Sequence, residues 1–123
     1  MSAGGVAGLS THVLDTARGR PAAGVRIDFS LVEPDGRTRL IRTVTTGADG
    51  RSEPALLGPA DMRVGRYELL FHVAAYFRAS GMALPEPPFL EQVPVRFAIA
   101  EADAHYHVPL LVSPYGYVTY RGS

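Results

Sequence analysis

The chain contains no cysteine and no lysine, and these absences exclude several kinds of chemistry. Without cysteine it has no thiol nucleophile, no disulfide and no thiolate ligand for a metal ion. Without lysine it can form no Schiff base, and it lacks the lysine that phosphate-binding loops use. All twelve basic side chains are therefore arginines. The side chains left for catalysis are those of His, Asp, Glu, Ser, Tyr and Arg.

Long apolar runs and an excess of charge are also missing. No stretch approaches the roughly 20 apolar residues that cross a bilayer, so we expect no membrane span. The twelve arginines are balanced by twelve acidic residues and are scattered along the chain. Nucleic-acid binding needs a concentrated basic face, so we expect no nucleic-acid partner. The N-terminus has neither a basic start nor an apolar segment of secretory length, and we expect a cytoplasmic protein.

The length of 123 residues suits one domain with one core. No internal repeat, low-complexity segment or linker divides the chain. We expect residues 1–8 to form a flexible lead and residues 9–123 to form a single domain.

Apolar and polar residues alternate in three segments, which are residues 25–31, 67–73 and 93–99. A period of two is typical of a half-buried β-strand. Pro94 lies inside the third segment and cannot donate to a ladder, so this strand should lie at a sheet edge or carry a bulge. Turn-forming sequences separate the segments: PDG at 34–36, GADG at 47–50 and Gly65. This pattern predicts an all-β sandwich or barrel.

One segment departs from the strand pattern. Residues 73–80 are rich in alanine and aromatic residues and are followed by Gly81, which predicts a short helix ended by a C′ glycine. Residues 84–89 contain three prolines and should form an extended loop, because each proline fixes its own φ and removes a donor.

Polar side chains interrupt strand-like or turn sequences at a few positions. His12 lies within a strand-like run whose other residues are suited to packing, and Arg51 follows an Asp-Gly turn. His105 and His107 share one face of their strand because of the period of two. Each has an ordinary explanation, since a lone strand histidine is usually a hydrogen-bonded structural residue and an arginine after Asp-Gly is usually solvated. We interpret His105 and His72 as structural or solvated.

The last residues of the chain, which include Tyr120, Arg121 and Ser123, would by themselves be interpreted as a frayed terminus. No single one of these features supports an enzyme. Their combination is more informative, because four motifs occur together: HVLD at 12–15, DGR at 49–51, HYHVPLL at 105–111 and YRGS at 120–123.

In these four motifs the chain resembles the 5-hydroxyisourate hydrolases of the transthyretin-like family. The resemblance covers residues 9–123, and the terminal YRGS is its most specific part. The PA pair at 21–22, the segment 25–31 and SPY at 113–115 are also similar to transthyretin. Two departures are visible, Val112 where a third leucine is usual and Val118 where serine is common. Both leave the chemical groups of the motifs in place.

The resemblance implies a fold and an assembly. The fold is a Greek-key β-sandwich of two four-stranded sheets with one short helix, and the assembly is a homotetramer, a dimer of dimers around a central channel. It also implies that His12, Arg51, His107 and Tyr120 face this channel, with Ser123 close by, and that two subunits complete each site.

The implied reaction is the opening of the N1–C6 bond of 5-hydroxyisourate by water, which yields 2-oxo-4-hydroxy-4-carboxy-5-ureidoimidazoline in urate degradation. His12 and His107 would jointly activate water and deliver protons, and Arg51 would stabilise the oxyanion. Tyr120 and Ser123 would position substrate or water through their hydroxyl groups. We expect neither a metal nor a cofactor, and the residues leave open which histidine is the general base.

Three alternatives remain at this point. A carrier could bind a small aromatic ligand in an apolar channel, although burying unpaired polar groups there costs roughly 1 to 3 kcal/mol each. A metal-dependent hydrolase could use the imidazoles of His12, His105 and His107, although no carboxylate lies at a telling spacing beside them. A non-catalytic structural sandwich would explain the strands but not the terminal motif.

Overall fold

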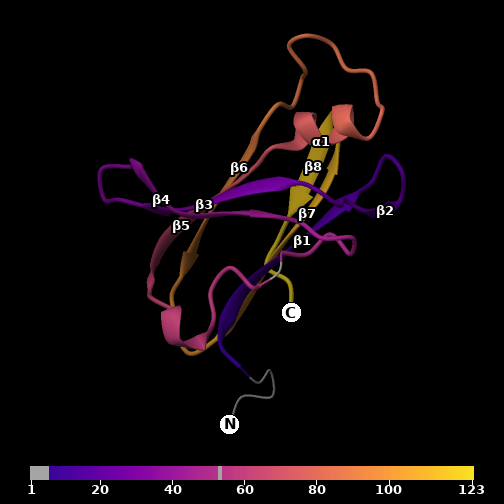
Figure 1. Ribbon diagram of the computed structural model, residues 1–123. Helices are drawn as coiled ribbons and strands as arrows, with labels where there is room; N and C mark the ends of the chain where they lie inside the picture. Colours follow the sequence, from indigo (N-terminus) through magenta and orange to yellow (C-terminus); the bar gives the residue numbers. More distant parts are fainter. Residues whose placement is uncertain (1–5, 53) are drawn as a thin grey trace.

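The computed structural model describes residues 6–52 and 54–123, which form two four-stranded sheets and one α-helix (Figure 1). The sandwich of two four-stranded sheets with one short helix that the family resemblance implies is therefore confirmed. Of the lead expected over residues 1–8, residues 1–5 lie outside the described residues. The elements in chain order are β1 (Gly8–Asp15), β2 (Arg20–Pro21), β3 (Arg26–Val32), β4 (Thr38–Thr45), the 3₁₀ helix η1 (Pro59–Asp61), β5 (Gly65–Phe71), α1 (Val73–Ala79), β6 (Val93–Ile99), β7 (His105–Ser113) and β8 (Gly116–Thr119).

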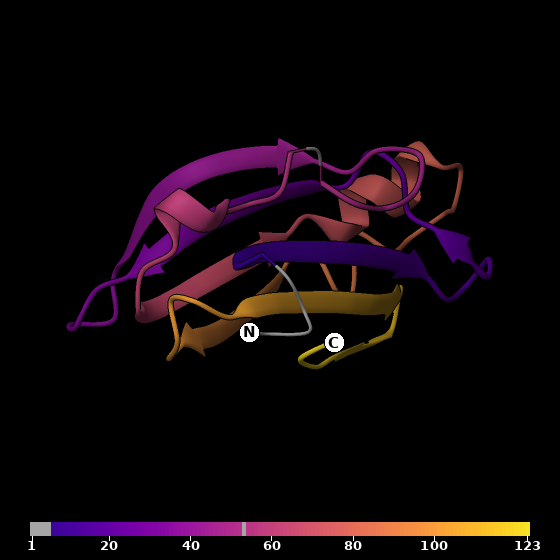
Figure 2. The ribbon, with the colours of Figure 1, turned by 90° about the horizontal axis from the view of Figure 1, so that it is seen from below.

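The strand order is β2-β1-β7-β8 in one sheet and β4-β3-β5-β6 in the other. The central pair β1 and β7 is parallel, and every other strand pair is antiparallel. Figure 2 shows β1 and β7 side by side in one layer, with β3 and β4 in the layer above them. This pairing brings the first strand of the chain against the seventh, although nearly the whole sequence separates them.

The core lies between the two sheets and is built by the alternation of the strands. Ile27 and Phe29 on β3 and Phe71 on β5 are fully buried, as is Leu110 on β7. Burial of a side chain of this size contributes roughly 1.5 to 3 kcal/mol relative to exposure. Because the apolar residues of β1 and β7 point into this core, the residues between them point to the outer face of their sheet.

The predicted strands agree with the observed ones with small shifts. The segment 25–31 forms β3, shifted by one residue, and the segment 93–99 coincides with β6. Pro94 is tolerated because β6 is an edge strand, as the sequence predicts. The segment 67–73 forms β5, but this strand ends at Phe71 because Val73 already belongs to the helix.

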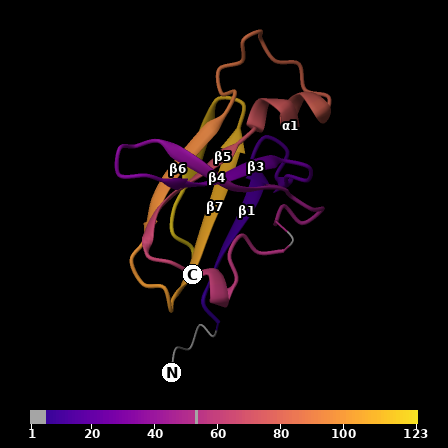
Figure 3. The same ribbon diagram turned by 60° about the vertical axis from the view of Figure 1, so that its left-hand side comes forward.

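The short helix α1 lies at one end of the molecule, and η1 lies at the opposite end (Figures 1 and 3). Gly81 follows the helix with φ of +92°, and its N–H donates to the carbonyl oxygen of Arg78 at 3.0 Å. The C′ glycine predicted from the sequence is therefore confirmed. In residues 6–52 and 54–123, no helix has the length and apolar character needed to cross a membrane.

Candidate active site

The outer face of the sheet β2-β1-β7-β8 carries a row of polar side chains. The parallel register places Ser10 of β1 opposite His107 of β7. Along each strand the next residue on the same face is two positions away, which adds His12 on β1 and His105 on β7. Ser10, His12 and His107 are partly buried and His105 is exposed, so solvent reaches this face.

Arg51 reaches the same face through the turn that precedes it. The N–H of Val13 in β1 donates to the carbonyl oxygen of Gly50 at 2.8 Å, and Arg51 forms an isolated antiparallel bridge with His12. Gly50 has φ of +80°, and a Cβ there would overlap the carbonyl oxygen of Val13. Glycine is therefore required for the turn to approach β1 so closely. The turn sequence predicted at residues 47–50 thus also positions Arg51, one of the candidate site residues.

The imidazole of His12 is oriented by this turn. Its Nε2 lies 2.8 Å from the carbonyl oxygen of Asp49, and a carbonyl oxygen only accepts hydrogen bonds. Nε2 therefore carries the proton and donates it, which leaves Nδ1 as the basic nitrogen of neutral His12. The carboxylate of Asp49 in turn accepts from the backbone N–H of Arg51 at 3.0 Å, which fixes the start of the following segment.

His107 has an altered acidity at this position. Burial lowers the pKa of His107 below its ordinary value of 6.5, and the nearby positive charges of Arg51, His12 and His105 lower it further. A hydrogen-bond contribution from Ser10 opposes these effects only in part. The imidazole is therefore neutral, and so able to accept a proton, at pH values where an ordinary histidine is still partly charged.

The terminal motif returns to the same strand. The N–H of Gly122 donates to the carbonyl oxygen of His107 at 2.7 Å, and a Cβ on Gly122 would lie 2.6 Å from Cδ2 of His107. Beside it, Arg121 donates to the carbonyl oxygen of His105 at 3.1 Å, and its guanidinium lies 4.0 Å from the centre of the Tyr106 ring. The tail therefore packs against β7 and leaves room at Gly122 only for a hydrogen atom.

The structure does not join the hydroxyl groups of Tyr120 and Ser123 to the polar groups of this site. Tyr120 is 56% exposed and lines a hollow of about 420 Å³ between β6 and the end of β8. Ser123 is exposed at the end of the chain. Within the described residues, neither hydroxyl group forms a hydrogen bond with His12, Arg51 or His107.

Comparison with known proteins shows the family to which the chain belongs. The family model of the HIUase/Transthyretin family matches residues 9–122. The chain belongs to this family. It is 61% identical to 5-hydroxyisourate hydrolase 2 of Rhizobium meliloti (strain 1021), over 94% of this chain and 95% of that protein.

Solved structures of the family extend the comparison. A crystal structure of (S)-allantoin synthase has a TM-score of 0.87 and 42% identity, and the match covers 96% of this chain and 44% of that one. Transthyretin from Sparus aurata has a TM-score of 0.80 and 30% identity, covering 93% and 95% of the two chains. Since proteins with different names share the HIUase/Transthyretin fold, the fold alone does not decide the function, and the side chains of the site must.

Three residues of this site were given no role of their own in the analysis of the sequence. Ser10 bonds to two histidines, Asp49 orients His12, and Gly122 packs against His107. Ser10 could have been found, because it lies two residues before His12 and so shares its face. The contact of Gly122 with His107 could not, because it depends on how the tail folds back.

The three-histidine metal site considered from the sequence receives no geometric support. In residues 6–52 and 54–123, no group of three or more His, Asp or Glu side chains is arranged to hold a metal ion. His105 and His107 instead direct one nitrogen each at the same hydroxyl group, that of Ser10.

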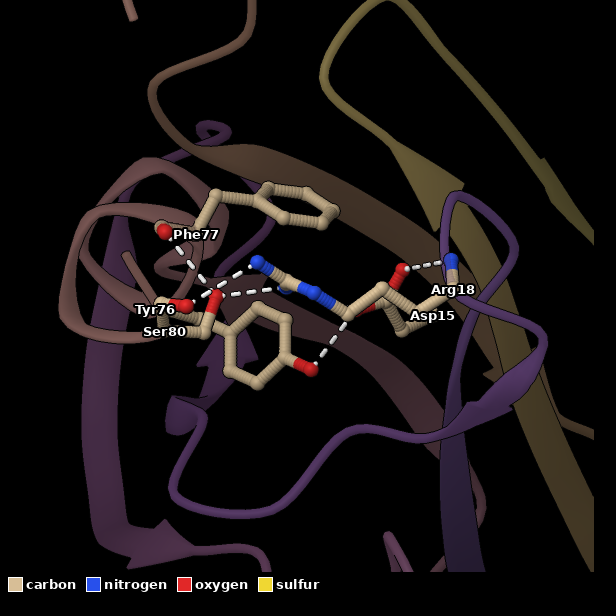
Figure 4. A network of polar contacts seen from close by, with 5 residues as sticks. All are labelled: Asp15, Arg18, Tyr76, Phe77 and Ser80. Carbon is tan, nitrogen blue, oxygen red and sulfur yellow. Dashed lines mark hydrogen bonds and ion pairs between the residues drawn. The ribbon is translucent and has the colours of Figure 1, made fainter. Parts of the chain in front are cut away.

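A second polar cluster begins at the other end of β1 (Figure 4). The buried carboxylate of Asp15 accepts from the Tyr76 hydroxyl at 2.8 Å and from the backbone and guanidinium of Arg18 at 3.0 and 3.2 Å. Arg18 also donates to the side chain and the carbonyl oxygen of Ser80. These bonds tie β1 to the end of α1, and we interpret the cluster as structural.

Proposed function

We propose that the chain hydrolyses the N1–C6 bond of 5-hydroxyisourate and forms 2-oxo-4-hydroxy-4-carboxy-5-ureidoimidazoline in urate degradation. The observation that carries this proposal is the convergence of His12, His107 and Arg51 on one solvent-accessible face, with the pKa of His107 lowered. The name of the bacterial relative at 61% identity supports the same reaction class. A carrier would have no use for a neutral imidazole beside a guanidinium.

His107 is the general base of the proposed reaction. Its lowered pKa keeps it neutral near pH 7, and no hydrogen bond within the described residues occupies its Nε2. Nε2 takes a proton from water while the water oxygen attacks the ring carbonyl carbon C6. The N1–C6 bond of the tetrahedral intermediate then breaks, and the proton held by Nε2 passes to the leaving nitrogen N1, which restores the neutral imidazole. Proton transfer to a positioned base contributes typically about 10²- to 10⁴-fold to such a rate.

Arg51 stabilises the negative charge that develops on the carbonyl oxygen. A guanidinium stays protonated at all relevant pH values and presents several N–H donors in one plane. His12 contributes through Nδ1, the nitrogen that its bond to Asp49 leaves free, and positions an N–H of the substrate ring. Tyr120 and Ser123 add hydroxyl groups at the border of the site.

The proposed assembly is a homotetramer, a dimer of dimers with the sites in a central channel. This assembly is supported by the exposed region beside β6 and β8, the edge strands of the two sheets. There a hollow of about 420 Å³ lies between exposed edges, and Tyr117, Val118 and Tyr120 are large exposed side chains. A second copy that covers this region would bury these side chains. Analytical ultracentrifugation tests the assembly, and a monomer at micromolar concentration would contradict it.

An ultraviolet assay tests the reaction. Urate oxidase produces 5-hydroxyisourate in place, and the protein should accelerate the loss of its absorbance. The substitutions His107→Ala, Arg51→Ala and His12→Ala should each lower kcat/KM by about 10²- to 10⁴-fold. Arg37→Ala is a matched control, because Arg37 is an exposed arginine in the β3–β4 hairpin and should leave the rate unchanged.

Two outcomes would overturn the proposal. One is a wild-type protein that binds the substrate without consuming it, which would favour a carrier. The other is a set of three folded alanine variants that all keep the wild-type rate, which would place the reaction elsewhere in the molecule.

A further inference from the structure

The hydroxyl group of Ser10 lies between two imidazoles. Its Oγ is 2.8 Å from Nδ1 of His107 and 3.2 Å from Nε2 of His105. A serine hydroxyl has one proton, so it can donate to only one of these nitrogens. When every proton in the row is paired, Ser10 donates to one imidazole and accepts from the other.

The direction of the two hydrogen bonds of Ser10 decides which nitrogen of His107 is basic. If Ser10 donates to Nδ1 of His107, the remaining ring proton of the neutral imidazole sits on Nε2, and no nitrogen can accept a proton from water. If Nδ1–H of His107 donates to Ser10, the hydroxyl proton points to His105 and Nε2 of His107 is free. Only the second direction provides the base.

The second direction also suits the charged form of His107. When Nε2 gains a proton from water, Nδ1 keeps its own proton and its bond to Ser10. The hydroxyl group therefore need not rotate during the step, and no proton other than that of water moves. A hydrogen-bond network that is already arranged for the charged form avoids a reorganisation cost at the moment of reaction.

We propose that Ser10 is a positioning residue for His107 and that His105 is the acceptor which directs the hydroxyl proton of Ser10 away from His107. This inference rests on the proposed function, since it assumes that Nε2 of His107 is the base. It also gives the exposed His105 a defined part in the site.

The first test measures the tautomer and does not depend on turnover. Imidazole ¹⁵N spectra in alkaline buffer, where all the histidines are neutral, should show His107 with its proton on Nδ1. Ser10→Ala should move His107 toward the Nε2–H form, which a solvent-exposed histidine side chain favours in water. Ser10→Thr keeps the hydroxyl and suits a strand, so it should retain the wild-type tautomer. His105→Phe should give a mixture, because the hydroxyl proton loses its acceptor.

The second test is kinetic. Removing the hydrogen-bond partner of a metal-bound histidine typically costs about 10- to 100-fold. We expect Ser10→Ala to lower kcat by a similar factor with little change in KM. Ser10→Thr should restore most of the rate. Thermal unfolding of each variant controls for loss of structure.

The outcomes separate this inference from the proposed function. If Ser10→Ala keeps both the Nδ1–H tautomer and the wild-type kcat, Ser10 has no positioning role. If Ser10→Ala and Ser10→Thr lose activity equally while the tautomer stays unchanged, the effect is steric and the inference is also wrong. If the wild-type protein does not consume 5-hydroxyisourate, the proposed function fails, whereas the spectra still decide how Ser10 orients the ring.

Discussion

Each of the two polar clusters on β1 contains an arginine and a serine, but the clusters differ in how completely their polar groups are paired. Around Asp15, the carboxylate accepts three hydrogen bonds and is 0% exposed. Around His107, one ring nitrogen is bonded to Ser10, and no partner within the described residues occupies the other. A fully paired buried cluster stabilises the fold, whereas unpaired lone pairs near solvent are available for a substrate.

The acidities of the two clusters differ in the same way. Burial raises the pKa of Tyr76, and the hydrogen bond and negative charge of Asp15 raise it further, so its hydroxyl stays protonated and donates. Burial and nearby positive charges lower the pKa of His107 and keep it ready to accept a proton. The raised pKa of Tyr76 keeps its hydroxyl bonded to Asp15, whereas the lowered pKa of His107 keeps the imidazole in the neutral form that a general base needs.

The largest effect should come from removing the buried carboxylate. Asp15→Ala leaves Arg18 and Tyr76 without their shared acceptor, and breaking a buried ion pair costs about 3 to 5 kcal/mol. We expect about 3 kcal/mol, because the Arg18 side chain is 23% exposed and can be partly hydrated. Chemical denaturation measures this loss. Asp35→Ala, which removes an exposed pair with Arg37, should change stability by less than about 0.5 kcal/mol. Equal effects of the two substitutions would contradict the structural role of the Asp15 cluster.

Tyr76→Phe should lower the stability of the protein less than Asp15→Ala does. It removes one donor to the Asp15 carboxylate while the ring stays packed, and a hydrogen bond to a charged group contributes about 2 kcal/mol. Denaturation should show this loss of stability, and kcat/KM of the folded variant should equal that of the wild type. A large loss of activity at full folding would mean that the two clusters are coupled.

Gly122→Ala should lower activity and leave stability almost unchanged, the reverse of Tyr76→Phe. The added Cβ would lie 2.6 Å from Cδ2 of His107 and must displace either the tail or the imidazole. We expect kcat/KM to fall about tenfold, which corresponds to about 1.4 kcal/mol in the barrier. The unfolding midpoint should change little, because Gly122 lies outside the strands and outside the buried core. Unchanged kinetics would show that the tail can move away without affecting His107.

The smallest effect concerns the charge beside the base. Arg51→Gln removes a positive charge that lowers the pKa of His107, so this pKa should rise toward the ordinary value of 6.5. Burial, the larger cause, remains, and the pKa should stay below that value. An NMR titration of His107 measures the shift. In the wild type, kcat/KM should decrease only as the pH falls below 6.5, because activity is lost when His107 becomes protonated and its pKa lies below that value. A pKa that does not move in the variant would place Arg51 too far from His107 to act on it.

Much of the fold could be predicted from patterning, and the exceptions have physical causes. The segments that became β3, β5 and β6 were predicted because one face of each packs in the core. β4 shows no such alternation, since nearly all of its residues are exposed on both faces. Strand β2 has only two residues, too few for any periodic signal. The end of β5 was misplaced because Val73 fits either a strand or the start of α1.

The residues of the candidate site could be named from motifs, but their mutual arrangement could not be derived from them. A period of two places Ser10 with His12, and His105 with His107, on one face of each strand. It does not indicate that β1 and β7 are neighbours, or that Ser10 lies opposite His107. That register follows from the packing of two apolar faces into one core, in which residues 97 positions apart in the sequence become hydrogen-bond partners.

The candidate residues, and which of them share a face of one strand, could be derived from the sequence alone. The reason is that successive side chains of a β-strand point to opposite faces whichever strand lies beside it. Three features depend on the folded structure: the pairing of β1 with β7, the close approach of the Gly50 turn to β1, and the nitrogen of His12 and of His107 that forms a hydrogen bond. These features depend on contacts between distant segments, and such contacts form only when the whole sandwich closes around its core.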